Sequence, residues 1–168
     1  MTTEIDNANR VEALRTLIEI ANDRKARGKS PDGPWFSVNE IEAMYKVGHD
    51  LFEQAQWRKA QTIFSMLRMF DATDTRFPLA EGICHKLLKQ YGNALRSFAR
   101  LVELMPGSDI DDPKLVMNVA ECLIGLGDKA QALAVLKQAL SRKRAPGNDA
   151  GLWQRALQWY SMMIKGVA

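Results

Sequence analysis

The chain of 168 residues repeats itself at a spacing of 34 positions. Four pairs of matching residues have this spacing: Gly48 and Gly82, Trp57 and Tyr91, Ala60 and Ala94, and Phe64 and Phe98. A third copy follows at a spacing of 38, through Ala120 and Ala132. A fixed period of this length is typical of stacked helical hairpins, because one hairpin cannot bury its apolar face without a neighbour.

The residue types at the repeating positions suit two closely packed helices. On the first helix of each copy, a small residue lets the second helix approach: Gly48, Gly82 and Ala120. On the second helix, a large apolar residue fills the remaining gap: Phe64, Phe98 and Leu136. The sequence therefore predicts an all-α protein, a tetratricopeptide-repeat solenoid of three helical hairpins over residues 37–145.

Signals for the starts of helices agree with this division. The run Ser37–Glu40 has the spacing of a capping box before the first helix. Asp74 is placed to cap the first helix of the second copy. Asp112 and Pro113 fit the N-cap and the first position of the next such helix. The four extra residues of the third copy fit in the preceding loop, residues 107–112.

A further helix is predicted over residues 8–26, within an N-terminal region of residues 1–36 that ends in a Pro- and Gly-containing linker. Five apolar residues share one face of this helix: Val11, Leu14, Leu17, Ile18 and Ala21. Such a stripe needs burial. It packs either on the repeats or on the same stripe of a second copy, which makes these residues candidates for dimerisation.

The C-terminal region, residues 146–168, is predicted to hold a last helix over about residues 149–165. Its apolar face is rich in aromatic residues, including Trp153, Trp159 and Tyr160. Repeat arrays need a terminal element that covers their open end. We therefore interpret this helix as a cap, with a partner site as the alternative.

Composition argues against nucleic acids and membranes as partners. The 23 basic and 20 acidic residues give a net charge of only +3, without the basic face that nucleic-acid binding requires. No apolar run approaches the roughly 20 residues of a membrane helix, so no membrane insertion is expected. The polar N-terminus has no signal-peptide pattern. The two cysteines fit buried, reduced thiols in a cytoplasmic protein.

The sequence offers no centre for catalysis or for a cofactor. Cys84 and Cys122 lie far apart, and His49 and His85 do not add a metal-ligand spacing, so no metal site is predicted. No Ser/His/Asp, Cys/His or phosphate-loop motif is present. We therefore expect neither an enzyme nor a bound cofactor, and a function in binding.

The first helix of each copy is expected to line a concave groove. The inner faces of these helices carry ten candidate contact residues: Tyr45, His49, Phe52, Leu79, Ile83, Lys86, Leu87, Met117, Glu121 and Ile124. The surface is mostly apolar and aromatic, which suits an extended peptide or a helix with apolar anchors. For each residue, a place in the core between helices is the alternative, because helical spacing does not separate the two.

Several runs resemble a known family. They are Ile41–Tyr45, Trp57–Phe64, Asp74–Phe77 and Val119–Leu123 with Gly127 and Asp128. In these runs the chain is similar to the class II chaperones of bacterial type III secretion, of the LcrH/SycD type, over about residues 40–140. Its departures from the family pattern include His49, Glu81 and Pro78.

The resemblance implies a cytoplasmic chaperone for the hydrophobic translocator proteins that form the pore in the host membrane. It implies that an extended partner segment with prolines and a leucine binds in the groove, where the family's aromatic positions fall on Tyr45, His49 and Phe52. It also implies a homodimer, formed through the N-terminal helices when no partner is bound. The alternatives are a repeat scaffold or adaptor of the secretion apparatus, or a chaperone of a needle subunit.

Overall fold

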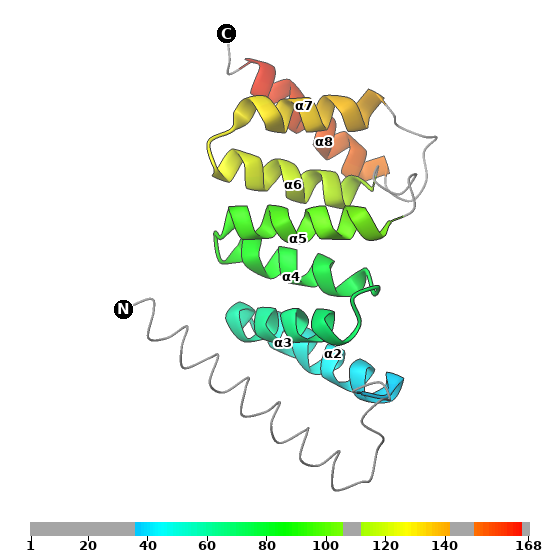
Figure 1. Cartoon of the computed structure of the whole chain (residues 1–168). Helices are drawn as coiled ribbons and strands as arrows, with labels where there is room; N and C mark the ends of the chain where they lie inside the picture. Colours follow the sequence, from blue (N-terminus) through cyan, green and yellow to red (C-terminus); the bar gives the residue numbers. More distant parts are fainter. Residues whose placement is uncertain (1–35, 106–111, 142–149, 166–168) are drawn as a thin grey trace, which may run out of the picture. The chain divides into compact units, whose positions relative to one another are not determined.

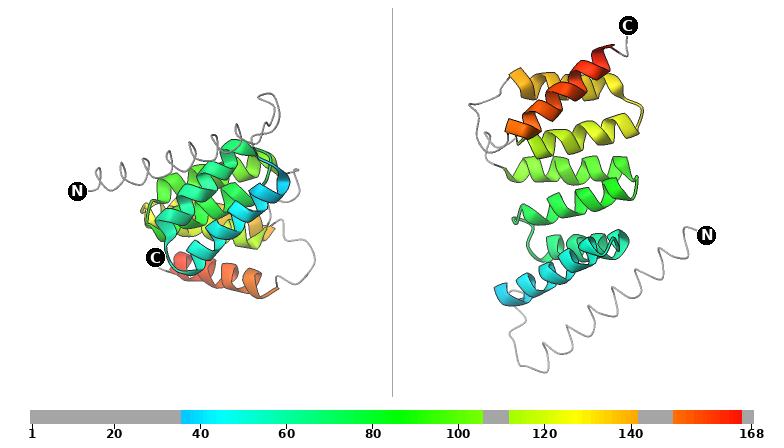
Figure 2. Two further views of the ribbon diagram at one scale, coloured as in Figure 1. Left: turned by 90° about the horizontal axis from the view of Figure 1, so that it is seen from below. Right: turned by 180° about the vertical axis from the view of Figure 1, so that it is seen from behind.

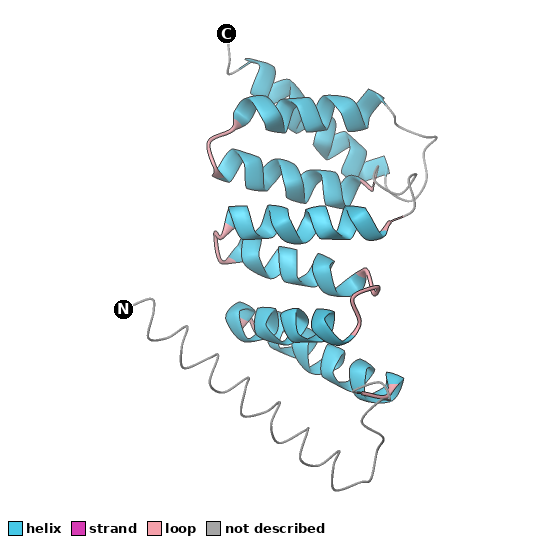
Figure 3. Ribbon diagram, in the orientation of Figure 1, coloured by secondary structure: helices cyan, strands magenta, loops and turns pink. Residues whose placement is uncertain are grey.

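Every described element of the computed structural model is an α-helix, as Figure 3 shows. The structure describes residues 36–105, 112–141 and 150–165. The helices are α2 (Val38–Glu53), α3 (Trp57–Phe70), α4 (Arg76–Leu87), α5 (Tyr91–Leu104), α6 (Pro113–Gly125), α7 (Lys129–Ser141) and α8 (Ala150–Lys165) (Figure 1). The predicted all-α class is confirmed. The predicted N-terminal helix, with its stripe from Val11 to Ala21, lies outside the described residues.

The chain divides into two compact units between Ala72 and Thr73. The first unit contains the hairpin of α2 and α3, and the second contains α4 to α8. Within the second unit, α4, α5, α6 and α7 follow one another as successive layers (Figure 1), each in contact with the next. The three predicted hairpins therefore correspond to α2–α3, α4–α5 and α6–α7.

In the first unit, the hairpin closes around Phe64. A Cβ atom on Gly48 of α2 would lie only 2.8 Å from Cε1 of the Phe64 ring, so the ring occupies the space that a side chain would need. The Tyr45 ring packs on the same residue, with 5.7 Å between ring centroids. At the other end of the hairpin, Phe36 and Phe70 meet edge to face at 4.4 Å. Aromatic contacts thus hold the hairpin together at two places along its length.

The second unit repeats this arrangement in α4 and α5. A Cβ atom on Gly82 would lie 2.5 Å from Cε1 of Phe98. In α6 and α7 the equivalent residues Ala120, Ala132 and Leu136 have no exposed surface. The pairing of a small with a large residue is thus seen directly in the first two hairpins, and in the third the equivalent residues share one buried cluster.

A second glycine contact joins neighbouring hairpins. The Tyr91 ring of α5 lies against Gly125 of α6, where a Cβ atom would come within 2.4 Å of the ring. Below it, Phe98, Leu115 and Cys122 belong to one buried cluster between α5 and α6. The apolar faces of the two hairpins therefore bury each other, as the repeat model requires.

The last helix, α8, packs on the end of this unit. Trp153 is 8% exposed and Ala156 is fully buried, and both join the core formed by α6 and α7. Figure 2 shows α8 running across these two helices, which it contacts. Its bounds differ by one residue from the sequence prediction, and it covers the apolar face of the last hairpin, as expected of a capping helix.

The turns inside the three hairpins share one geometry that the sequence did not indicate. The residue after each C-cap has a positive φ: Ala55 at 57°, Lys89 at 58° and Gly127 at 84°. The N–H groups of Ala55 and Gln56 donate to the carbonyls of Phe52 and Leu51, which is the double bond pattern of a Schellman motif. The other two turns repeat it. Glycine suits this conformation at no steric cost, whereas the first two turns accept it in other residues.

The helix starts largely follow the sequence signals. Ser37 and Glu40 form the predicted capping box, and Asp112 accepts a hydrogen bond from the N–H of Lys114 as the N-cap of α6. At α4 the N-cap position is Thr75, whose side chain makes no capping bond. Instead, Asp74 accepts a hydrogen bond from the N–H of Arg76 at 2.9 Å. The capping bond at the start of α4 thus comes from the residue before the N-cap.

We predict that Gly82→Ala destabilises the protein although alanine favours helices. Its methyl group overlaps the Phe98 ring, and such overpacking costs about 1–3 kcal/mol, against a gain of about 0.5–1 kcal/mol in helix propensity. The midpoint of thermal unfolding, followed by circular dichroism, should fall by several degrees.

Gly92→Ala is the matched control, because a Cβ atom there meets nothing within 4 Å. It should leave the midpoint unchanged or raise it slightly. If Gly82→Ala were as stable as Gly92→Ala, the close approach of α4 and α5 would not depend on this glycine.

Candidate functional site

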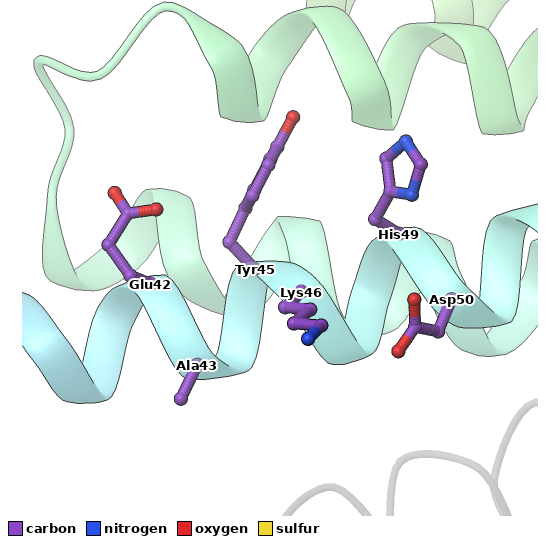
Figure 4. Close-up of a pocket in the computed structure, with 6 residues that line it drawn as sticks. All are labelled: Glu42, Ala43, Tyr45, Lys46, His49 and Asp50. Atoms are coloured by element: carbon purple, nitrogen blue, oxygen red, sulfur yellow. The ribbon is translucent and has the colours of Figure 1, made fainter.

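Three of the predicted contact residues lie on α2 in the first unit. Tyr45 is partly buried against Phe64, and Phe52 is also partly buried. His49 is exposed, with its Nε2 atom 3.9 Å from Oε1 of Glu53. Figure 4 shows that Tyr45 and His49 project from the same side of the helix. The helix therefore presents two partly buried aromatic side chains, of which Tyr45 rests on Phe64, and one exposed imidazole ring.

A shallow depression of about 510 Å³ lies along α2. Its described lining residues are Glu42, Ala43, Tyr45, Lys46, His49 and Asp50 (Figure 4). All six belong to one helix, and the four not in the predicted set are mostly charged and exposed. Such a lining lacks the enclosed, convergent polar groups typical of a catalytic cleft. It fits the rim of a surface for a larger partner.

The other candidates, apart from Met117, lie where α4 and α6 are adjacent in the second unit. Leu79 and Ile83 are partly buried on the cluster beneath α4, and Leu87 is 36% exposed. Ile124 of α6 packs at the edge of the core below that helix. We call the surface formed by Leu79, Ile83, Lys86, Leu87, Asn118, Glu121 and Ile124 the α4–α6 face.

A polar cluster crosses the α4–α6 face. The Lys86 ammonium donates to Oδ1 of Asn118 at 2.6 Å and forms an ion pair with the Glu121 carboxylate. The Asn118 amide in turn donates to the carbonyl of Lys114, which fixes its orientation. The structure thus brings the predicted residues Lys86 and Glu121 together. Asn118 was not predicted as a contact residue. It lies three residues before Glu121 on α6, and residues at this spacing are neighbours on a helix surface.

Met117 occupies a different environment from the rest of the predicted set. It is 6% exposed and belongs to the core cluster of α6, α7 and α8, with Val116 and Leu123. Helical spacing places it on the inner edge of α6, but the neighbouring helices cover its side chain. It therefore offers little surface to a partner, and we leave it out of the α4–α6 face.

Two buried polar residues of α4 form a short chain of contacts. Glu81 is 4% exposed and His85 is 8% exposed. His85 Nδ1 donates to Oε1 of Gln90 at 2.7 Å, while its Nε2 faces Oε1 of Glu81 at 4.0 Å. Hydrogen bonding of this kind is what permits a polar side chain to be buried. The sequence marked Glu81 as a departure from the family pattern but did not indicate its burial.

Both cysteines are buried and held as neutral thiols. Burial raises the pKa of Cys84 from 9.0 to about 12, and the nearby Glu81 carboxylate adds to the rise. Burial also raises the pKa of Cys122 to about 11; Lys86 opposes this change and Glu121 supports it. Neither thiol has the depressed pKa of a reactive cysteine. Both act as small apolar side chains of the core.

Neither a metal centre nor a membrane-spanning segment is found in the described part of the chain. No group of three His, Cys, Asp or Glu side chains gathers there to hold a metal ion. None of the helices described combines the length and the apolar character needed to cross a bilayer.

Comparison with known proteins connects this site with a family. No protein-family model matches the chain. The chain is 28% identical over 96 residues to low calcium response locus protein H of Yersinia pestis, a match that covers 57% of this chain and 55% of that protein. The chain thus spans about half the length of the curated relatives it matches.

Two crystal structures of PcrH, a protein of Pseudomonas aeruginosa, are similar over more of the chain. PcrH in complex with the chaperone-binding region of PopD has a TM-score of 0.71 and 28% identity, covering 79% of this chain and 97% of that chain. PcrH in complex with the chaperone-binding region of PopB has 30% identity and a TM-score of 0.64, covering 76% and 97%. The chain belongs to the class II chaperones of type III secretion.

Membership in the class II chaperones agrees with what the site offers. The described residues form surfaces of aromatic and aliphatic side chains on the first helices of the hairpins. The family resemblance stated from the sequence and the tetratricopeptide-type fold are both confirmed.

We predict that neither cysteine reacts readily in the folded chaperone. At pH 8 a pKa of about 11 leaves roughly a hundredfold less thiolate than the unperturbed value does. Reaction with a chromogenic disulfide at pH 8 should therefore be at least about a hundredfold slower in the native protein than in urea. Equal rates in the two states would contradict the burial of the thiols.

The same pKa values set the direction of a stability effect. The folded chain holds the thiol protons more tightly than the unfolded chain. This contribution to stability is therefore complete below about pH 9 and is lost as the pH rises through 11 and 12. Replacing Cys84 by Ala should remove this residue's share of the effect, so the free energy of unfolding should fall less steeply as the pH rises above 9.

Proposed function

We propose that the chain is a chaperone of the bacterial cytoplasm that binds hydrophobic translocator proteins and keeps them soluble and competent for secretion. The observation that carries this proposal is the likeness to PcrH, whose structures contain the chaperone-binding regions of PopD and PopB and match this chain at 28% and 30% identity. On this proposal the protein acts by binding alone and catalyses no reaction.

The chemistry of the surface supports a polypeptide as the bound partner. Proteins that insert into membranes carry large apolar segments, which aggregate when exposed to water. Tyr45 and Phe52 on α2, and the aliphatic residues of the α4–α6 face, are partly exposed apolar side chains on a rigid helical support. An extended segment with apolar side chains, including proline and leucine, is the partner that we propose for these surfaces.

The physical requirement for later release also agrees with this role. An extended segment that becomes ordered on binding uses part of the gross interaction energy for ordering. The resulting affinity suits a complex that must form in the cytoplasm and come apart at the secretion apparatus. Because binding needs only a preformed surface, no cofactor is required.

We predict that Tyr45→Ala combined with Phe52→Ala weakens binding of the translocator. Each ring contributes about 1.5–3 kcal/mol when it is fully buried by a partner, so the double variant should lose at least about tenfold in affinity. The measurement is co-expression with a translocator of the same bacterium, followed by capture of the soluble complex and determination of its dissociation constant.

Val47→Ala is the matched control, since Val47 is an apolar residue of the same helix, is 52% exposed and is not among the proposed contacts. It should leave the complex intact. Thermal unfolding of each variant separates loss of binding from loss of fold. A folded double variant with undiminished binding would remove α2 from the proposed surface, and a translocator that stays insoluble with the wild-type protein would overturn the proposed function.

We also propose that the chain forms a homodimer when no partner is bound, through Val11, Leu14, Leu17, Ile18 and Ala21 at the N-terminus. Deleting residues 1–30 should convert the dimer into a monomer, because the apolar stripe is removed. Light scattering at several protein concentrations measures the mass.

A double variant, Leu14→Asp with Ile18→Asp, should have the same effect as the deletion. Thr16→Asp changes the opposite face of the same predicted helix and should leave the dimer intact. A truncated protein that remained dimeric would show that the stripe is not the contact.

A further inference from the structure

Lys86 and Glu121 are the charged residues of the described α4–α6 face, and with Asn118 they form what we call the Lys86 cluster. The Lys86 side chain is only 18% exposed, and that of Glu121 is 35% exposed. On α4, Lys86 follows Ile83 by three residues and precedes Leu87, and on α6 Ile124 follows Glu121 by three. At 18% exposure, the Lys86 side chain is less hydrated than that of an exposed lysine.

The ammonium group has more donors than its contacts use. A protonated lysine has three N–H donors and no acceptor. Among the described residues, its acceptors are Asn118 Oδ1 and the Glu121 carboxylate. One donor is therefore left for an acceptor outside the cluster. Because two oxygens already fix the position of the ammonium, a further hydrogen bond costs little additional side-chain entropy.

The charge balance of the cluster indicates which acceptor it favours. Lys86 and Glu121 neutralise each other, so the pair has no net charge to attract a carboxylate. A second carboxylate beside Glu121 would experience like-charge repulsion in a partly desolvated site. A backbone carbonyl carries no net charge and meets no such repulsion. An extended segment has many carbonyls without intramolecular partners.

We propose that Lys86 is a specificity-determining residue, which donates a hydrogen bond to a backbone carbonyl of the bound segment while Glu121 selects against an acidic side chain at that position. This inference rests on the proposed function, because it assumes that the α4–α6 face binds the translocator segment. Lys86 and Glu121 would thus add one polar, sequence-selective contact to a surface whose other contacts are apolar.

The alternative for the cluster is a structural link between α4 and α6. The two roles predict different binding for a variant that lacks both charges. Lys86→Met keeps the aliphatic stem and removes the donor, but it leaves Glu121 without its partner. Adding Glu121→Gln removes that unpaired charge. A structural link predicts that the double variant regains binding, whereas a missing donor predicts that it does not.

The test uses full-length chaperone and a fluorescent peptide. The peptide is the translocator segment that the co-expressed complex protects from proteolysis, and fluorescence anisotropy gives its dissociation constant. Lys86→Met and the Lys86→Met/Glu121→Gln double variant should each weaken binding about tenfold. Lys114→Met, which replaces an exposed lysine of α6, should leave binding unchanged. Circular dichroism and thermal unfolding verify the fold of each variant.

A second arm tests the selection against acidic residues. Each peptide residue is replaced in turn by Asp, and binding to the wild type is compared with binding to Glu121→Gln. At one position the peptide with Asp should bind Glu121→Gln at least about tenfold better than it binds the wild type. This gain should be absent when Lys86→Met is added, because the positive charge that attracts the new carboxylate is then missing.

The outcomes separate this inference from the proposed function. If the wild type binds the peptide and the double variant binds as well as the wild type, the donor role of Lys86 is overturned while the chaperone function stands. Equal Asp profiles for the wild type and Glu121→Gln would overturn the selective role of Glu121. If the wild type fails to bind the peptide, the proposed function fails, and this inference fails with it.

Discussion

The contact between a small residue of one helix and a large side chain of the next sets the distance within each hairpin. In the first two hairpins the partners are Gly48 with Phe64 and Gly82 with Phe98, and the aromatic ring occupies the volume of the absent Cβ atom. Protein interiors are packed too tightly to absorb even one additional methyl group without adjustment. The position of the first helix in these two hairpins, and of the candidate contact residues on it, therefore follows from these contacts.

That dependence connects the core with the proposed surfaces. Tyr45 rests on the same Phe64 ring that closes the first hairpin, so its orientation is fixed from below. In the second unit, Tyr91 against Gly125 holds α5 on α6, which in turn determines how α6 lies beside α4. Lys86 and Glu121 meet because of this arrangement. A partner thus encounters side chains whose conformational entropy is already reduced, which favours binding.

The repeat pattern was sufficient to predict the helices and their glycine contacts, since both depend on residue size at a fixed spacing. It was insufficient for features that depend on distances between helices. Lys86 and Glu121 are 35 positions apart, and nothing in the pattern shows that they pair. Met117 shares the helical spacing of the exposed candidates, but its neighbours cover it. The separation of the chain between Ala72 and Thr73 has no evident sequence signal.

The three Schellman turns determine where this architecture accepts changes in length. Three residues join the two helices of every hairpin, at residues 54–56, 88–90 and 126–128, because the motif fixes both the hydrogen bonds and the number of residues. The connections between hairpins follow no such rule: α3 and α4 are joined by residues 71–75, and α5 and α6 by residues 105–112. Insertions and deletions in related chains should therefore accumulate in these connections between hairpins. The same connections are the natural place to introduce an affinity tag or a spectroscopic label without disturbing the helices.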